Sequence, residues 1–268
     1  MLIGCTRMYN VTPGVAELWR ALIERAADRA GIPLEVIDYP APAPLDALWS
    51  RDDMGCVFMC GWPFRRSTHD PRIVAAPVPD TALCSGPTYC TVMVVRADSA
   101  HQSLEDTFGG RIAWTDEGSH SGFNAPRRML LAHRKDGQPL YRESIGPVVT
   151  PRASLNSVIE GRADIAPVDS YFHQLLERHE PETAAKLRVV ARTDCAPMPV
   201  LTAARAVPAE TAEALGRALE GAAGDPASAA LLRDLCLSGF ERVPDPERYA
   251  LTETWDEEAR RAGYHRPG

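Results

Sequence analysis

Two hydrophobic patterns alternate along the first half of the chain. Apolar residues recur at helical spacing between Val15 and Ala26, which predicts a helix that ends near Gly31. Unbroken apolar runs predict buried strands at 55–59, 73–78 and 89–96. Strands that alternate with helices are typical of an α/β protein with parallel strands and crossover helices.

The second half continues in the same way. Short apolar runs predict strands at 111–114, 148–149, 162–169, 187–191 and 200–204. Helical spacing predicts helices at 122–132, 153–161, 171–180, 210–222, 227–236 and 246–262. We find no internal repeat, so the chain is expected to fold as a large α/β protein rather than as a repeat array.

One strand-to-helix junction carries the most chemistry, the segment from Asp116 to Asn124 with the sequence DEGSHSGFN. Its serines and glycines stand where a helix begins, at the positive end of the helix dipole. Hydroxyls and free backbone N–H groups at such a place form a site for an anion. The alternative is that Ser119 or Ser121 only caps the helix. The segment alone leaves both interpretations open.

Composition excludes two classes of function. With 268 residues, 45% apolar and 24% charged, the chain has the balance of a globular protein of one large domain or two lobes. A net charge of −7 without a basic run argues against nucleic-acid binding. No apolar stretch approaches the roughly 18 residues of a membrane span, so we expect no membrane insertion. No secretory signal is visible, which predicts a cytoplasmic protein, or a periplasmic one if a signal has been removed.

The seven cysteines form no Cys-x-x-Cys pair and no cluster with zinc spacing. We therefore expect neither a metal nor another cofactor. Cys60 and Cys84 each lie beside a loop that contains glycine, and a disulfide between them would favour an oxidising compartment.

Several short motifs follow one another in a specific order. They are Tyr9 after the first strand, CGWPFR at 60–65, the strand at 89–96, SHSG at 119–122, RASL at 152–155, and EGRAD at 160–164 leading to Asp169. In this order the chain resembles the phosphate/phosphite/phosphonate substrate-binding proteins of ABC transporters. The resemblance extends from near residue 5 to near residue 240.

The resemblance implies a two-lobed α/β fold of the type 2 periplasmic-binding-protein kind, with mixed sheets, flanking helices and a hinge of two crossings at 91–96 and 190–194. One lobe would comprise 1–92 plus 193–268, and the other 93–192 with the SHSG loop. The protein would bind a small phosphonate- or phosphate-like metabolite in the cleft between its lobes, without chemistry. Its partners would be this small anionic ligand and an ABC permease.

Ligand roles are implied for the residues that match. Ser119 and Ser121 would hold the anion with their hydroxyls, and His120 with its backbone N–H. Tyr9 and Tyr89 would cover the head group, although core packing is an equal alternative for both. These five residues form the centre of the expected site.

Three further residues complete the expected set. Asp169 would meet a ligand ammonium, or else cap the next helix. Trp62 stands in a strand-exit loop, with core packing as its alternative. Where relatives often have an anion-binding histidine this chain has Pro151, so the charge of Arg152 is expected to replace it.

Two other functions stay open at this level. The same fold resembles that of some biosynthetic enzymes of menaquinone and thiamine metabolism. In such an enzyme Cys60 or Cys90 would be the nucleophile, with His120 as its base. A cytoplasmic ligand sensor is the third class.

Overall fold

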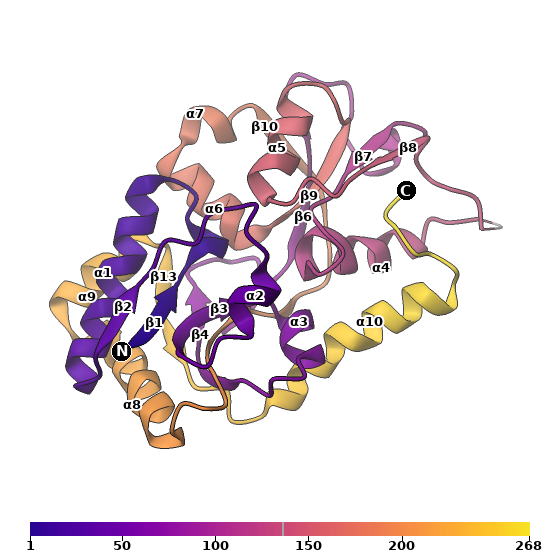
Figure 1. Cartoon of the computed structure of the whole chain (residues 1–268). Coiled ribbons are helices and arrows are strands. Elements are labelled where there is room, and N and C mark those ends of the chain that lie inside the picture. Colours follow the sequence, from indigo (N-terminus) through magenta and orange to yellow (C-terminus); the bar gives the residue numbers. More distant parts are fainter. Residues whose placement is uncertain (136) are drawn as a thin grey trace. The chain divides into compact units, whose positions relative to one another are not determined.

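The computed structural model describes residues 1–135 and 137–268. Its contacts divide the chain into two compact units (Figure 1). The first unit comprises Met1–Thr88 and Pro197–Arg248, and the second comprises Tyr89–Ala196 and Tyr249–Gly268. Both combine a sheet with helices, which confirms the predicted α/β class.

The first unit is built on a six-stranded mixed sheet in the order β13-β4-β12-β3-β1-β2. Its strands are β1 (Leu2–Cys5), β2 (Leu34–Val36), β3 (Met54–Met59), β4 (Arg72–Pro79), β12 (Val200–Ala203) and β13 (Leu237–Glu241). Strand β1 runs parallel to β2 and β3, whereas β12 is antiparallel to β3 and β4. All six residues of β3 are buried, as its unbroken apolar run predicted.

Helices of the first unit pack on this sheet and on one another. They are α1 (Pro13–Ala30), α2 (Leu45–Trp49), α3 (Gly61–Arg66), α8 (Ala209–Glu220) and α9 (Pro226–Asp234), with 3-10 turns at Arg7–Tyr9, Gly221–Gly224 and Pro246–Tyr249. Thr12 caps α1 by accepting the Val15 N–H, and Gly31 ends it in the left-handed conformation. The predicted end near Gly31 is confirmed, and of the two candidate caps that the sequence offered at the start, Asn10 and Thr12, the structure uses Thr12.

The second unit is built on a five-stranded sheet in the order β10-β6-β9-β7-β8. Its strands are β6 (Thr91–Arg96), β7 (Arg111–Ala113), β8 (Glu143–Ile145), β9 (Ile165–Asp169) and β10 (Leu187–Arg192). Strand β7 is parallel to β8 and to β9, and β6 is antiparallel to β9 and β10. The carboxyl ends of β7, β8 and β9 consequently lie at one edge of this sheet.

Helices follow each of these parallel strands. The second unit contains α4 (Ala125–Leu131), α5 (Pro151–Ile159), α6 (Ser170–His179), α7 (Pro181–Ala184) and α10 (Ala250–Arg261), with a 3-10 turn at Glu105–Thr107. A π-helical turn, His120–Asn124, leads directly into α4. Short strands β5 (Thr88–Tyr89) and β11 (Ala196–Pro197) stand where the chain passes between units.

The last twenty residues differ from the expected division, which placed them with the first lobe. They cluster with the second unit because α10 packs on α4 and on the π-helical turn. The chain therefore passes between units a third time, after Arg248. A polar amphipathic tail gave no signal of which unit would receive its apolar face.

One strand prediction is wrong, and one strand was not predicted. Residues 148–149 form no strand, and the strand at this place is β8 at Glu143–Ile145. Val149 has a φ of 72°, which is incompatible with an extended strand. Strand β13 at Leu237–Glu241 was not predicted, because its apolar residues are interrupted by Ser238 and Gly239.

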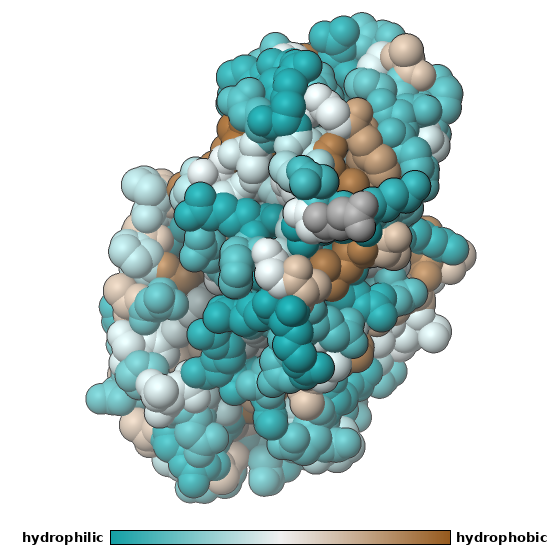
Figure 2. Space-filling view, turned by 90° about the vertical axis from the view of Figure 1, so that its right-hand side faces the viewer, coloured by the Kyte–Doolittle hydropathy of each residue, from teal (hydrophilic) through white to brown (hydrophobic). Residues whose placement is uncertain are grey.

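Hydrophilic residues predominate on the face shown in Figure 2, where hydrophobic residues appear only in small separate areas. Of the helices described, none is both long enough and apolar enough to span a membrane. Cys60 is buried and forms no disulfide, whereas Cys84 is disulfide-bonded, so the prediction of a Cys60–Cys84 bridge is wrong.

Candidate functional site

Three helix starts lie at the carboxyl edge of the second unit's sheet. Ser119 precedes the π-helical turn after β7, Thr150 precedes α5 after β8, and Asp169 ends β9 and precedes α6. Each of these side chains accepts a backbone N–H of the helix that it begins. Ligands of α/β proteins bind beyond the carboxyl ends of strands, where helix N-termini meet.

The first of these starts is the anion loop, by which we mean residues 116–124. Ser119 Oγ accepts the Gly122 N–H at 2.9 Å, so the predicted capping role is present. A hydroxyl that accepts one bond still has its own proton to donate. In the described part of the chain, the backbone N–H groups of His120 and Ser121 donate to no other group. The cap therefore leaves donors available at the positive end of the helix.

Close packing fixes the shape of this loop. A Cβ at Gly122 would lie 2.0 Å from the Thr115 hydroxyl oxygen, so only glycine fits there. The Thr115 N–H in turn bonds to the Gly122 carbonyl, at 3.4 Å. The glycine thus holds the first turn of the helix against the end of β7.

His120 is a core residue in spite of its place in the loop. Its side chain is 1% exposed, and burial lowers its pKa to about 3, so the imidazole is neutral. The ring stacks on Trp255, with centroids 5.3 Å apart, and its Nδ1 lies 3.1 Å from Asn124 Nδ2. A neutral, enclosed imidazole adds no positive charge for an anion. The backbone N–H remains the donor that this residue offers.

Ser121 is 9% exposed and is held through its backbone. Its carbonyl accepts the Thr91 hydroxyl at 3.0 Å, and the Thr91 N–H donates to Thr193 Oγ1 at 3.0 Å. Sequence reasoning missed both threonines. The available signal was a buried threonine at the start of the otherwise apolar strand at 89–96.

Asp169 realises the helix-cap alternative. One of its carboxylate oxygens accepts the N–H groups of Tyr171 at 2.8 Å and Phe172 at 3.1 Å. It pairs with Thr91 across β6 and β9, so it lies close to the support of Ser121. This start of a helix therefore carries an anion that belongs to the protein.

Arg152 also has an internal partner. Both terminal nitrogens of its guanidinium lie 2.8 Å from the carboxylate of Glu180. Such a two-pronged pair satisfies most of the charge that was expected to meet the ligand.

The aromatic candidates separate between the units. Tyr89 lies in the second unit, buried, with its ring 6.2 Å from the His120 ring. In the first unit, Tyr9 packs edge-on against Phe58 at 5.0 Å, and Trp62 is buried on α3. The second unit thus assembles the anion loop, Tyr89 and Asp169, while Tyr9 and Trp62 belong to the first.

Nothing at these positions resembles an activated nucleophile. Burial raises the pKa of the Cys90 thiol, which keeps it protonated and unreactive. His120 is neutral, and its Nδ1 is hydrogen-bonded to Asn124. Over the residues that the structure describes, no three His, Cys, Asp or Glu side chains gather in a way that could hold a metal ion.

A family model described as "ABC transporter, phosphonate, periplasmic substrate-binding protein" matches residues 13–249. The chain belongs to this family. Its members are substrate-binding proteins of transporters rather than enzymes, and the resemblance inferred from the motifs is confirmed. No curated protein matches the sequence at a significant level.

Solved structures share the fold of this phosphonate-family protein at low sequence identity. It is similar to a binding protein component of an ABC phosphonate transporter from Pseudomonas aeruginosa, with 16% identity, a TM-score of 0.80, and coverage of 98% of this chain and 88% of that one. It is also similar to PhnD1 from Prochlorococcus marinus in complex with methylphosphonate, with 14% identity, a TM-score of 0.76, and coverage of 97% and 98%. The periplasmic binding protein BugD has 12% identity, a TM-score of 0.66, and coverage of 98% and 97%. These likenesses confirm the two-lobed binding-protein fold class.

Proposed function

We propose that the protein binds a small phosphorus oxyanion, with an alkylphosphonate as the leading class, at the anion loop. The observation that supports this most directly is the start of the π-helical turn. There the N–H groups of His120 and Ser121 have no acceptor among the described residues, beside the neutral cap Ser119. An anion at this point would receive backbone donors and the helix dipole together.

The chemistry of the loop suits a phosphonate. A tetrahedral oxyanion accepts several hydrogen bonds, and the loop offers two backbone N–H groups and two serine hydroxyls. PhnD1, which shares the fold, has been solved with methylphosphonate. We propose Ser119, Ser121 and the backbone of His120 as the principal contacts, with Tyr89 beside them.

The other predicted contacts enter the proposal in secondary roles. Asp169 and Arg152 already bind groups of the second unit. We propose that Asp169 affects which substituent the ligand carries, and that Arg152 contributes little direct binding. Tyr9 and Trp62 are proposed as contacts from the first unit, testable with Tyr9→Phe and Trp62→Phe.

Calorimetry with methylphosphonate, phosphate, phosphite and sulfate tests the proposal. We expect one phosphorus oxyanion to bind, and Ser121→Ala to weaken it by about tenfold because one hydroxyl donor is lost. Ser238→Ala, at an exposed position on β13, is the matched control and should bind like the parent. Absence of binding to every phosphorus oxyanion by a folded protein would refute the proposal.

We further propose that the protein works in the periplasm with an ABC permease. Family membership supports this role, and so do the disulfide-bonded Cys84 and Cys195, since such bonds persist in oxidising compartments. Uptake of labelled ligand in cells that lack the protein, with and without its restored gene, measures the role. Equal uptake in both would contradict it.

A further inference from the structure

The C-terminal helix α10 contacts the anion loop and α4 at three places. Trp255 stacks on the His120 ring with an interplanar angle of 25°. The Thr252 carbonyl accepts Asn124 Nδ2 at 2.8 Å, and Asp256 forms a buried ion pair with Arg127. Three successive turns of the loop and α4 are thus tied to one helix from the far end of the sequence.

The hydrogen bonds of Asn124 determine how His120 carries its proton. Because Asn124 Nδ2 donates to the Thr252 carbonyl, this atom is the amide nitrogen and a donor. The same nitrogen lies 3.1 Å from His120 Nδ1, which must then be the acceptor. A neutral imidazole that accepts at Nδ1 carries its proton on Nε2. Asn124 therefore selects one tautomer, while Nε2 has no hydrogen-bond partner among the described residues, so the orientation of the ring also depends on its stack against Trp255.

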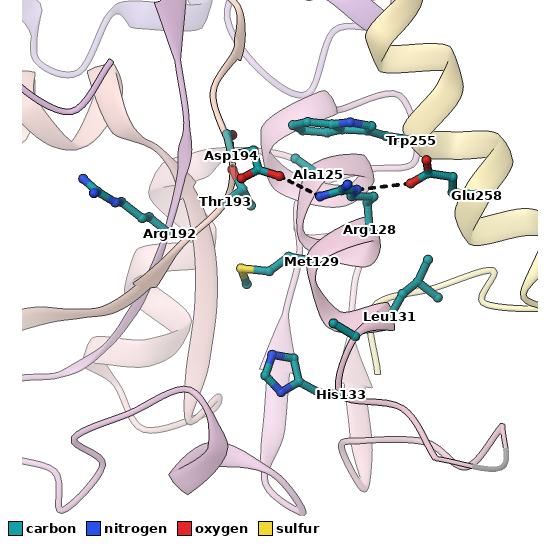
Figure 3. A pocket seen from close by; sticks show the side chains of 11 residues that line it. Ala125, Arg128, Met129, Leu131, His133, Arg192, Thr193, Asp194, Trp255 and Glu258 are labelled. Carbon is teal, nitrogen blue, oxygen red and sulfur yellow. Dashed lines mark hydrogen bonds and ion pairs between the residues drawn. The ribbon is translucent and has the colours of Figure 1, made fainter.

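A second cation lies beside the indole that stacks on His120. The Arg128 guanidinium is 5.3 Å from the Trp255 ring centroid, and it forms ion pairs with Asp194 at 2.7 Å and Glu258 at 3.1 Å. Figure 3 shows this arrangement, with Trp255 above Arg128 and the two acids to either side. These residues line a pocket of about 420 Å³ in the second unit. The indole is therefore fixed by contacts with His120 and with Arg128.

We propose that Trp255 is a positioning residue for the anion loop, acting through His120. The inference rests on the proposed function. The N–H groups of His120 and Ser121 make no hydrogen bond within the described residues. Ser121 is held through its carbonyl by Thr91, whereas the His120 ring is held by Trp255 and Asn124, so the exact position of the His120 N–H depends on the packing of that ring. Removing the indole frees the ring to rotate and spreads the donors over several positions. Ligand affinity then falls although Trp255 touches no ligand.

Three variants test this, each measured by calorimetry with methylphosphonate and by thermal unfolding. Trp255→Leu removes the stack, and Trp255→Phe keeps an aromatic face. Leu175→Ala opens a cavity on α6, in the core of the same unit, and serves as the control for lost stability. A purely structural role would lower the melting temperature of Trp255→Leu and Leu175→Ala without separating their affinities.

We expect Trp255→Leu to bind methylphosphonate at least about tenfold more weakly, because misplaced donors lose much of their interaction. Trp255→Phe should stay within about threefold of the parent, since an aromatic pair is retained. Leu175→Ala should keep the parent affinity at a lowered melting temperature. Parent-like affinity of Trp255→Leu, or an equal loss in Leu175→Ala, would overturn the proposal.

A measurement on the ligand-free protein separates this inference from the proposed function. In nitrogen NMR spectra, His120 of the parent should show a single neutral form protonated at Nε2. In Trp255→Leu we expect mixed tautomers. We also expect amide hydrogen exchange at Gly122 and Asn124, whose N–H groups bond to Ser119, to become faster by about tenfold or more. If the parent binds no phosphorus oxyanion, the proposed function fails, and these spectra still test whether Trp255 positions the loop. Unchanged spectra in Trp255→Leu would refute the positioning role.

Discussion

Two helix starts at the same edge of one sheet carry opposite kinds of cap. At the start of α6, one carboxylate oxygen of Asp169 accepts hydrogen bonds from two backbone N–H groups, at 2.8 and 3.1 Å. At the anion loop, the neutral hydroxyl of Ser119 accepts one backbone N–H. The N–H groups of His120 and Ser121 have no acceptor in the described residues. The first start already holds a carboxylate of the protein, and the second is the one at which we propose that an anion binds.

This difference teaches how a protein with a net charge of −7 can bind an anion. A helix start attracts negative charge through its dipole and its free N–H groups. A carboxylate cap such as Asp169 neutralises the partial positive charge of the helix start. A serine cap accepts the same kind of hydrogen bond but carries no charge, so the partial positive charge of the helix start remains. Four predictions test this comparison.

Exchanging the caps should have the largest effect. Ser119→Asp places a carboxylate where the ligand oxyanion is proposed to bind, and two unit charges 4 Å apart repel by about 4 kcal/mol near a protein surface. We expect affinity for methylphosphonate to fall by at least about 100-fold, measured by calorimetry. Because aspartate and serine are similar N-caps, the melting temperature should change little.

The neutral variant Ser119→Asn separates charge from shape, because asparagine caps a helix as well as serine does. Its affinity should stay much closer to that of the parent. If Ser119→Asp binds methylphosphonate as the parent does, the anion does not occupy this start of the helix.

The second prediction breaks the geometry of the same start. Gly122→Ala places a Cβ 2.0 Å from the Thr115 hydroxyl oxygen. Overpacking of this kind costs about 1–3 kcal/mol of unfolding free energy, and the displaced turn should also weaken ligand binding. Chemical denaturation measures the first effect and calorimetry the second.

Adding Thr115→Ala should recover part of the loss, because the hydroxyl and methyl that clash are removed. Gly14→Ala, whose new Cβ would have nothing nearer than 3.7 Å, is the control. Equal stability of Gly122→Ala and Gly14→Ala would show that the close contact does not shape the loop.

The third prediction concerns charge at the anion loop as pH falls. Burial lowers the folded-state pKa of His120 to about 3, below its ordinary value of 6.5. The unfolded chain therefore binds the proton first, and stability is lost as pH falls from 6.5 towards 3. Between pH 7 and pH 5 this amounts to about 2 kcal/mol of unfolding free energy.

Denaturation of the parent and of His120→Asn at both pH values isolates this contribution. Burial also lowers the pKa of His173, but that residue is present in both proteins and cancels from the comparison. An identical pH dependence in both proteins would mean that His120 protonates in the folded state, and the loop would then carry a positive charge of its own.

The sequence was most informative where local rules act alone. Val15 to Ala26 shows helical spacing, the Thr12 hydroxyl caps the start of α1, and Gly31, which has no side chain, ends it in the left-handed conformation. The segment at 116–124 could be placed at a strand-to-helix junction, although the segment alone left anion binding and helix capping as alternatives. Ser119 could also be predicted as a cap.

Long-range packing was not readable in the same way. Asp169 and Arg152 are residue types that bind charged ligands, yet each finds a partner inside the second unit, and no local pattern indicates Glu180 as the partner of Arg152. The contact between Trp255 and His120 joins residues 135 positions apart. Only the fold brings such pairs together.

The fourth and smallest prediction removes the charge from the occupied start. Asp169→Asn keeps an oxygen that can accept both N–H groups but loses the favourable interaction with the helix dipole, worth about 0.3–1 kcal/mol. The melting temperature should fall slightly. Affinity for methylphosphonate should rise by about two- to fivefold, because a like charge near Ser121 has been removed.

The same variant tests whether the Asp169 carboxylate pairs with an ammonium group on the ligand. For 2-aminoethylphosphonate the variant should lose affinity if the carboxylate pairs with the ammonium, and gain it, as with methylphosphonate, if Asp169 acts only as a cap. Thr150→Ala, which alters the neutral cap of α5 at the same edge, should change both ligands alike. Opposite shifts for the two ligands in Asp169→Asn would therefore assign the acid a role in binding, and parallel shifts would restrict it to α6.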